Sequence, residues 1–396
     1  MPAEGFWLDF VSPQSFLEFR QLARTEPKPA LRPVSLRALL AELGNAAPPF
    51  APARPDAKDR YLRREVARYA AALGIDLREP PGHPLDTTLA LRVAIAANDW
   101  RVTDALFDAY WSGAKIDDAA VIEQELSGRG IEATPLMTAA ARDESLAALS
   151  QNLKIAIDAG VFEVPTHIAG GQMQVGLSRD ALTVPMGTDA IDFYFDYASP
   201  FAYLATTQVP RLIEAGARVS LKPIVLGGLF KALGTANVPL FEMSQAKRDY
   251  QLRHLLRSAE RFGVPFRFAT KFPMNTVKAL RLTSLVAPTE RLALALAIFD
   301  AFWVHDRDIS SDDELSAIAH AAGIDAAAVW PKLEQEETKR ALREATDGAM
   351  ARGVFGVPTI VCDSPEQLSR GGGTSELFWG QDQVELVVRS MARRAR

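Results

Sequence analysis

Residues 192–205 read DFYFDYASPFAYLA, and this stretch carries the main prediction of the fold. Its apolar residues from Phe193 to Tyr197 are typical of a buried strand. Ser199-Pro200 then indicates a turn into an amphipathic segment, because proline is favoured in the first turn of a helix, where its missing N–H has no intrahelical partner. The stretch therefore predicts a strand that passes directly into a helix.

The same pattern occurs earlier in the chain, where residues 6–13 read FWLDFVSP. Further pairs follow in the same order at offsets of 187 to 193 residues: LRP at 31–33 with LKP at 221–223, LFDAYW at 106–111 with IFDAFW at 298–303, and GVFEVPT at 160–166 with GVFGVPT at 353–359. Such an ordered repeat indicates an internal duplication. It predicts one domain over 1–182 and a second over 190–396.

Each half has the same predicted layout. In the second half, a further strand runs from about Arg218 to Ile224 and is followed by a long helical stretch. Thr289 is a candidate cap for a helix there, and Ser311 with Glu314 forms a capping-box pattern. A strand after Pro358, a short strand near Trp379 and a final helix complete the half. A βαβ unit and a hairpin-plus-helix unit thus flank a helical insertion, which predicts an α/β fold in both domains.

Composition excludes several classes of protein. The chain has 396 residues, a net charge of −5 and no long basic run, which argues against nucleic-acid or anionic-membrane binding. Its single cysteine, Cys362, excludes an intrachain disulfide. The N-terminus lacks the pattern of a signal peptide, and no apolar run approaches the roughly 20 residues that span a bilayer. We therefore expect a soluble, cytoplasmic protein that binds neither nucleic acid nor membranes.

Ser199 is the first candidate for chemistry, because a helix N-terminus offers unpaired N–H groups and the positive end of a dipole. Such a position can stabilise an anion, including a thiolate. The alternative is that Ser199 only caps its helix. Pro358, just before an apolar strand, is either an edge proline or a cis proline that leaves neighbouring backbone groups free for a ligand.

Three polar residues each have either a structural or a ligand-binding interpretation. Asp382, in the run WGQD, either caps a helix or holds an ammonium group of a ligand. Lys231 is either a solvated surface lysine or an anion-binding group, and Asn275 is either a turn residue or a site residue. The five histidines show no metal-ligand spacing, so we predict no metal site.

Taken together, the segments DFYFDYASPFAYLA, KPIVLGGLFKALG, FPMNT, GVFGVPT and LFWGQD resemble the 2-hydroxychromene-2-carboxylate isomerases, which are close relatives of kappa-class glutathione transferases and DsbA-like thioredoxin-fold proteins. The resemblance covers about residues 190–395. It implies a thioredoxin fold with an inserted helical domain, glutathione as cofactor, and usually a homodimer. DsbA-like oxidases have Cys-x-x-Cys where this chain has Ser199-Pro200-Phe201-Ala202, so direct disulfide exchange is excluded.

The resemblance also implies roles for individual residues. Ser199 matches the serine that contacts the glutathione sulfur and is the implied catalytic residue. The remaining implied contacts are Val357 beside the cis proline Pro358, the γ-glutamyl-binding segment Gly380, Gln381 and Asp382, and the substrate-side residues Lys231, Asn237 and Asn275. Lys231 would pair with a substrate carboxylate. The implied reaction is isomerisation of an aromatic hydroxy acid in a catabolic pathway, by reversible addition of the glutathione thiolate.

The first half resembles the family less. It keeps Ser12 and Val164-Pro165-Thr166, but Ala41 and Asp86 stand where the second half has Lys231 and Asn275, and Val175-Gly176-Leu177-Ser178 stands in place of WGQD. We expect a degenerate copy that forms an intrachain pseudo-dimer with the second domain, with a homodimer also possible. Its helix with Leu106, Phe107, Tyr110 and Trp111 is expected to cover the partner domain.

Two other functions remain open from the sequence. One is a kappa-like glutathione transferase that conjugates electrophiles at the same site. The other is a non-catalytic scaffold that binds glutathione or a peptide. Retention of Ser199, Lys231 and WGQD in the second half favours an enzyme.

Overall fold

The computed structural model describes residues 3–44, 56–180, 182–236, 238–325, 328–362 and 375–394. The chain divides into two compact units. Unit 1 comprises Met1–Arg54, Arg63–Leu182 and Ser244–Lys247, and unit 2 comprises Pro55–Leu62, Thr183–Met243 and Arg248–Arg396. Each unit has its own four-stranded sheet. No described helix is long and apolar enough to cross a membrane.

In unit 2 the strand order is β6-β5-β7-β8. The strands are β5 (Ala190–Phe195), β6 (Arg218–Pro223), β7 (Thr359–Cys362) and β8 (Glu376–Trp379). β5 pairs in parallel with β6 and antiparallel with β7, and β7 pairs antiparallel with β8. The helices are α9 (Pro200–Thr206), α10 (Val209–Glu214), α11 (Leu226–Ala232), η1 (Pro239–Glu242), α12 (Gln245–Phe262, whose residues 245–247 belong to unit 1), α13 (Val277–Leu285), α14 (Arg291–Trp303), α15 (Asp312–Ala321), η2 (Trp330–Lys332), α16 (Glu336–Ala351), η3 (Gln381–Gln383) and α18 (Val384–Arg394).

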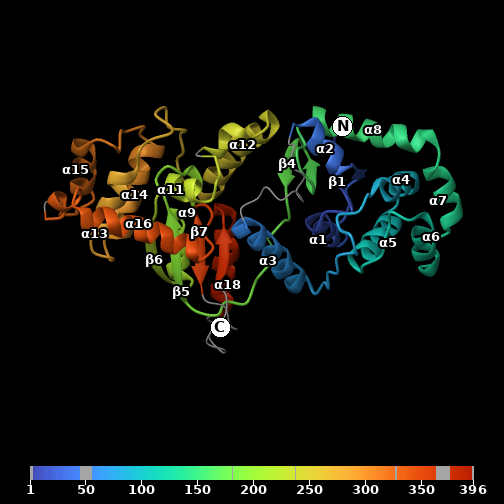
Figure 1. The fold of residues 1–396 in the computed structure, drawn as a ribbon, viewed down its shortest axis with the longest axis horizontal. Coiled ribbons are helices and arrows are strands. Elements are labelled where there is room, and N and C mark those ends of the chain that lie inside the picture. Colours follow the sequence, from blue (N-terminus) through green and yellow to red (C-terminus); the bar gives the residue numbers. More distant parts are fainter. Residues whose placement is uncertain are drawn as a thin grey trace. The chain divides into compact units, whose positions relative to one another are not determined.

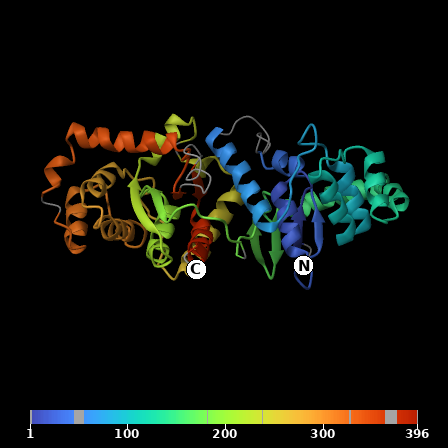
Figure 2. The same cartoon turned by 90° about the horizontal axis from the view of Figure 1, so that it is seen from below.

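The central strand β5 is buried because helices cover the sheet. Phe193 and Phe195 are fully buried, and the ring of Tyr197 lies 4.7 Å from that of Phe299 on α14. These aromatic contacts join the helical insertion to the sheet. Figure 1 shows α13, α14 and α15 grouped beside the strands, while the long helix α16, which is easily followed in Figure 2, contacts α11, α13 and β6.

Two predicted caps of the insertion need correction. Helix α14 has Glu290 at its N-cap position, so the prediction of Thr289 was wrong by one residue. Ser311 does occupy the N-cap position of α15, but its side chain makes no capping hydrogen bond. Glu314 instead accepts a hydrogen bond from Arg307 Nε at 2.6 Å, because an arginine within reach competes with the backbone for that carboxylate.

Unit 1 repeats this architecture with the strand order β2-β1-β3-β4. Its strands are β1 (Gly5–Leu8), β2 (Leu31–Pro33), β3 (Thr166–Ala169) and β4 (Gln172–Val175), and its helices are α1 (Pro13–Leu22), α2 (Leu36–Glu42), α3 (Asp56–Leu73, whose residues 56–62 belong to unit 2), α4 (Thr88–Ala97), α5 (Trp100–Trp111), α6 (Ala119–Gly128), α7 (Ala133–Ala140) and α8 (Asp143–Asp158). β1 is parallel to β2 and antiparallel to β3. The prediction of two tandem α/β domains with helical insertions is confirmed.

The apolar face of α5 is part of the core of unit 1 itself. Phe107 is fully buried and stacks against Phe16 at 5.5 Å, and it also contacts Phe10 and Phe19. The expectation that this helix covers a partner domain was therefore wrong. The sequence shows that a helix face is apolar, but it does not show which apolar face the helix meets.

Candidate functional site

Ser199 lies between the end of β5 and the start of α9. Its backbone is extended, with φ −102° and ψ 115°, and its Oγ accepts the Ala202 N–H at 3.1 Å as the N-cap of α9. The hydroxyl also donates to the Val357 carbonyl at 3.3 Å. Ser199 is only 5% exposed. One hydroxyl thus links the start of the helix to the proline loop.

The proline loop presents backbone groups beside this hydroxyl. The Val357–Pro358 peptide is cis, and the Pro358 carbonyl accepts the Gly380 N–H at 3.0 Å. Within the described residues, the Val357 N–H has no hydrogen-bond partner. Because a buried backbone donor is normally paired, this group is suited to an extended ligand that supplies a carbonyl.

The Gly380-Gln381-Asp382 segment begins at a residue that must be glycine. Gly380 has φ +107°, and a Cβ there would lie 2.6 Å from Asp382 Oδ1. Gln381 is buried, and its Nε2 lies 2.7 Å from Nε2 of His254 on α12. His254 in turn stacks on Tyr250, with ring centroids 5.7 Å apart.

His254 is a residue that sequence reasoning missed. The i, i+4 spacing of Tyr250 and His254 on a helix predicts that the two rings are neighbours. The contact with Gln381 depends on how α12 packs, which no local pattern reports. The structure therefore adds an imidazole to the candidate site.

An aromatic cluster adjoins the same loop within unit 2. Tyr61 lies 5.3 Å from Phe355 between ring centroids, and Phe355 lies 4.9 Å from Trp379. The Trp379 N–H donates to the Tyr61 hydroxyl at 3.2 Å. Gly356 sits against this cluster, since a Cβ there would lie 2.8 Å from Trp379 Nε1. The cluster was not predicted, because Tyr61 is 318 residues from Trp379 in sequence.

The three residues expected on the substrate side have different outcomes. Lys231 is exposed in the last turn of α11, and no ion pair involves it in the described part of the chain. Asn275 is exposed, and its side chain accepts the Val277 N–H at 3.1 Å, as a turn residue does. Asn237 lies outside the described residues. Within the described residues, no hydrogen bond or ion pair joins Lys231 or Asn275 to Ser199, so their roles at the site remain predictions.

Unit 1 keeps the serine end of this arrangement. Ser12 Oγ accepts the Ser15 N–H at 3.1 Å and donates to the Val164 carbonyl at 3.3 Å, and the Val164–Pro165 peptide is cis. Trp111 Nε1 donates to the Phe10 carbonyl at 3.1 Å, as Trp303 Nε1 does to Tyr197 at 2.9 Å in unit 2. The serine geometry therefore does not distinguish the two units.

The two units differ in the segment that follows the last strand of each sheet. The Ser178 N–H of unit 1 donates at 2.8 Å to the carboxylate of Glu18, a residue of α1 that is only 4% exposed. Burial raises the pKa of the Glu18 carboxyl, and the hydrogen bonds from Ser178 and Gln21 oppose that rise. Ala205 of α9 stands at the position of Glu18 in unit 2. Unit 1 thus carries an internal carboxylate beside the counterpart of Asp382.

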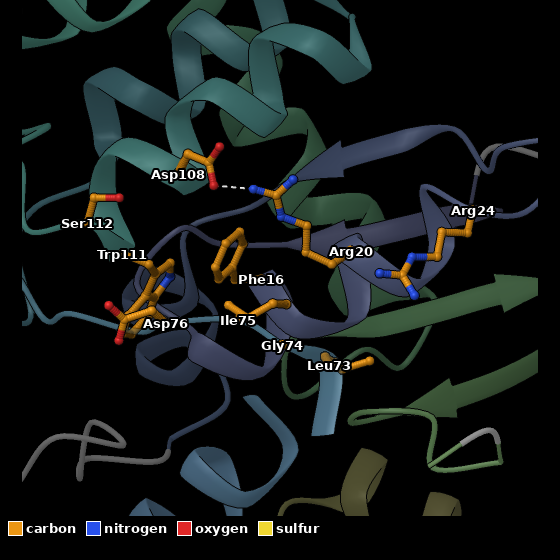
Figure 3. Close-up of a pocket in the computed structure, with 10 residues that line it drawn as sticks. All are labelled: Phe16, Arg20, Arg24, Leu73, Gly74, Ile75, Asp76, Asp108, Trp111 and Ser112. Atoms are coloured by element: carbon orange, nitrogen blue, oxygen red, sulfur yellow. Dashed lines mark hydrogen bonds and ion pairs between the residues drawn. The ribbon is translucent and has the colours of Figure 1, made fainter. Parts of the chain in front are cut away.

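A pocket of about 340 Å³ in unit 1 contains none of the predicted site residues. Figure 3 shows the Arg20 side chain directed towards Asp108, with Phe16 between Arg20 and Trp111. Arg20 pairs with both Asp104 and Asp108, so its charge is already neutralised. Among the described residues, no group of three or more His, Cys, Asp or Glu is placed to hold a metal ion.

Comparisons with known proteins identify the family of the chain. The family model for the DSBA-like thioredoxin domain matches residues 5–182 and again 190–392. A 2-hydroxychromene-2-carboxylate isomerase of Sphingobium xenophagum is 27% identical over 201 residues, which cover 50% of this chain and 96% of that protein. Glutathione S-transferase kappa 1 of Rattus norvegicus is 26% identical over 210 residues, covering 50% of this chain and 88% of that protein.

Among solved structures, a selenomethionine-labelled 2-hydroxychromene-2-carboxylate isomerase is 26% identical and covers 52% of this chain and 96% of its own, with a TM-score of 0.45. The cytosolic disulfide reductase DsbM of Pseudomonas aeruginosa with GSH is 17% identical and covers 52% of this chain and 97% of its own, with a TM-score of 0.38. Two matched segments and two thioredoxin-like sheets lead to one conclusion: the chain belongs to the DSBA-like thioredoxin domain family and contains that domain twice.

Proposed function

We propose that unit 2 is a glutathione-dependent isomerase of an aromatic hydroxy acid such as 2-hydroxychromene-2-carboxylate. The observation that carries the proposal is the position of Ser199 Oγ, at the N-terminus of α9 and 3.3 Å from the Val357 carbonyl. Relatives named as isomerases and kappa-class transferases support a glutathione-related enzyme of this family.

The residues present fit glutathione as a ligand. The Val357 N–H, which has no partner within the described residues, can pair with a peptide carbonyl, and Gly380 to Asp382 follow on the neighbouring strand end. Ser199 and the N-terminus of α9 favour a negative charge beside them. When bound, glutathione would supply the thiol chemistry that the chain lacks, because Cys362 is buried in β7.

The chain's own groups would act by binding and orientation. The Ser199 hydroxyl would turn from the Val357 carbonyl and donate to a thiolate, since a charged acceptor forms the stronger hydrogen bond. Lys231, exposed and without an ion pair within the described chain, would attract the carboxylate of the substrate. The imidazole of His254 would fix the orientation of Gln381, whose amide it contacts.

A kappa-like transferase that uses the same site is the second candidate, because a kappa-class relative is matched at nearly the same identity as the isomerase. Turnover of 2-hydroxychromene-2-carboxylate, measured against conjugation of chlorodinitrobenzene, separates the two. Glutathione binding without either activity would support a non-catalytic scaffold instead.

The direct test is an ultraviolet titration of bound glutathione. The thiol pKa should be lower than in free glutathione, because Ser199 and the α9 terminus stabilise the thiolate. Ser199→Ala should raise the pKa of the bound thiol by weakening that stabilisation. An equal pKa in the wild type and the variant would refute the role of Ser199.

A further inference from the structure

The Asp196 carboxylate, just after β5, is 2% exposed and accepts three hydrogen bonds. Its Oδ1 accepts the Ala198 N–H at 3.0 Å and the Thr276 hydroxyl at 2.6 Å, and its Oδ2 accepts the Leu226 N–H at 2.7 Å. A buried carboxylate is costly unless such bonds satisfy it. Its position therefore depends on all three donors being in place.

The three donors belong to three different segments, and each segment carries a residue of the candidate site. Ala198 immediately precedes Ser199, Leu226 is the first residue of the helix that carries Lys231, and Thr276 follows Asn275. We propose that Asp196 is the positioning residue of the unit 2 site, which sets the placement of the Ser199 turn, helix α11 and the Asn275 segment relative to one another. This inference rests on the function proposed above.

Unit 1 provides an independent copy of the same device. Asp9 accepts the Val11 N–H at 3.3 Å, the Leu36 N–H at 2.8 Å and the Thr87 hydroxyl at 2.6 Å. There it holds the Ser12 turn and the start of α2, although Ala41 and Asp86 replace the lysine and the asparagine. Disrupting the network should therefore destabilise either unit. Only its disruption in unit 2 should also lower activity.

Replacing Asp196 itself removes three bonds at once and risks unfolding, so the test acts on one donor. Thr276→Val removes the hydroxyl at constant shape and charge, and Thr276→Ser keeps it. Thr87→Val and Thr87→Ser are the matched variants in unit 1. All four are made in the full chain, and melting temperature, kcat and KM are measured for each.

Both valine variants should lower the melting temperature by a similar amount. Only Thr276→Val should lower kcat, by about tenfold or more, because small misplacements of reacting groups are costly. Thr276→Ser should restore kcat. Equal kcat values for the two valine variants, or wild-type kcat in Thr276→Val, would overturn the proposal.

A second arm needs no glutathione. Ser199→Cys places a thiol at the start of α9, and its pKa is read from the pH dependence of alkylation by iodoacetamide. All variants of this arm also carry Cys362→Ala, so that the native thiol of β7 cannot contribute. Adding Thr276→Val should raise the thiol pKa by about half a unit as the helix-terminus interaction weakens, whereas Thr276→Ser should not.

The two arms separate two kinds of failure. If wild-type protein binds no glutathione but the cysteine pKa responds to Thr276→Val, the proposed function fails and the positioning role stands. If the cysteine pKa is the same in all three backgrounds, the positioning role is refuted whatever the substrate.

Discussion

Unit 1 and unit 2 agree around the serine and differ beyond the last strand of the sheet. Both have a serine N-cap bonded to the loop of a cis proline, a tryptophan bonded to a carbonyl near the first strand, and a buried aspartate network. In unit 2, β8 leads into η3 and α18. In unit 1, the described residues after β4 contain no helix before β5.

This difference separates features common to the fold from features that support the proposed ligand site of unit 2. A feature retained in both units, such as the serine cap, stabilises the fold in both and cannot by itself distinguish a ligand site in one of them. The proposal of a glutathione site in unit 2 rather than in unit 1 therefore rests on features that the described part of unit 1 lacks: the lysine, the Gln381-Asp382 pair and a helix N-terminus after the last strand. Glu18 in unit 1 uses the Ser178 N–H for an internal bond, which leaves that group unavailable to a ligand carboxylate.

The largest expected effect comes from comparing the two serines. Ser199→Ala should lower turnover about 5- to 150-fold, which corresponds to losing about 1–3 kcal/mol of charge-assisted hydrogen bonding. Ser12→Ala removes the equivalent cap in unit 1. It should leave turnover unchanged and should lower the melting temperature about as much as Ser199→Ala does. Steady-state kinetics and thermal melts of both variants measure this.

Calorimetric titration sharpens the same comparison, with one glutathione expected per chain. Two equivalent sites, or a loss of activity in Ser12→Ala as large as in Ser199→Ala, would show that unit 1 is not degenerate. Either result would also contradict the interpretation that Glu18 keeps a ligand carboxylate from the Ser178 N–H of unit 1.

The next effect is the pH dependence of stability in unit 1. Because burial raises the folded-state pKa of Glu18 above its ordinary value of 4.5, its stabilising contribution is full below about pH 4.5 and is lost as pH rises through the raised pKa. Glu18→Gln should remove this decline while its amide oxygen still accepts the Ser178 N–H. Urea unfolding of both proteins between pH 4 and 8 measures the difference.

Glu385 of unit 2 gives a control with the opposite sign. Burial alone would raise its pKa, but hydrogen bonding and attraction from Arg211 and the nearby Arg261 lower it. Its contribution is present above its ordinary pKa and is lost as pH falls through the lowered one. Glu385→Gln should therefore lose stability at neutral pH. The same pH slope in both variants would contradict the assigned causes.

The sequence predicted the repeat, the strands and the serine turn, because these depend on local patterns that occur twice. The FWLDFVSP and FYFDYASP runs have the apolar residues of a buried strand and the turn residues that begin a helix. The roles of His254, Tyr61 and Glu18 could not be predicted, because each contacts residues more than 100 positions away. Asp196 and Asp9 were also missed, since an aspartate before a turn is normally a local turn residue.

The smallest expected effect concerns the packing of the first helix in each unit. In unit 2 the Tyr203 hydroxyl donates to the Pro265 carbonyl at 2.6 Å, and burial raises the pKa of Tyr203 to about 12. Unit 1 has Phe16 and Asp76 at the corresponding positions, and both line the pocket of Figure 3. Unit 1 thus lacks this hydrogen bond at a place where a pocket lies.

Tyr203→Phe should lower the free energy of unfolding by about 0.5–1.5 kcal/mol, because it removes a hydrogen bond to a part-buried carbonyl. The reciprocal Phe16→Tyr should gain less than about 0.5 kcal/mol, since the Asp76 carbonyl in an open pocket already exchanges hydrogen bonds with water. Urea unfolding of both variants measures the two changes. If Phe16→Tyr raised the free energy of unfolding by as much as Tyr203→Phe lowers it, the new hydrogen bond would be as stable as the native one. That result would contradict the assumption that water already satisfies the Asp76 carbonyl.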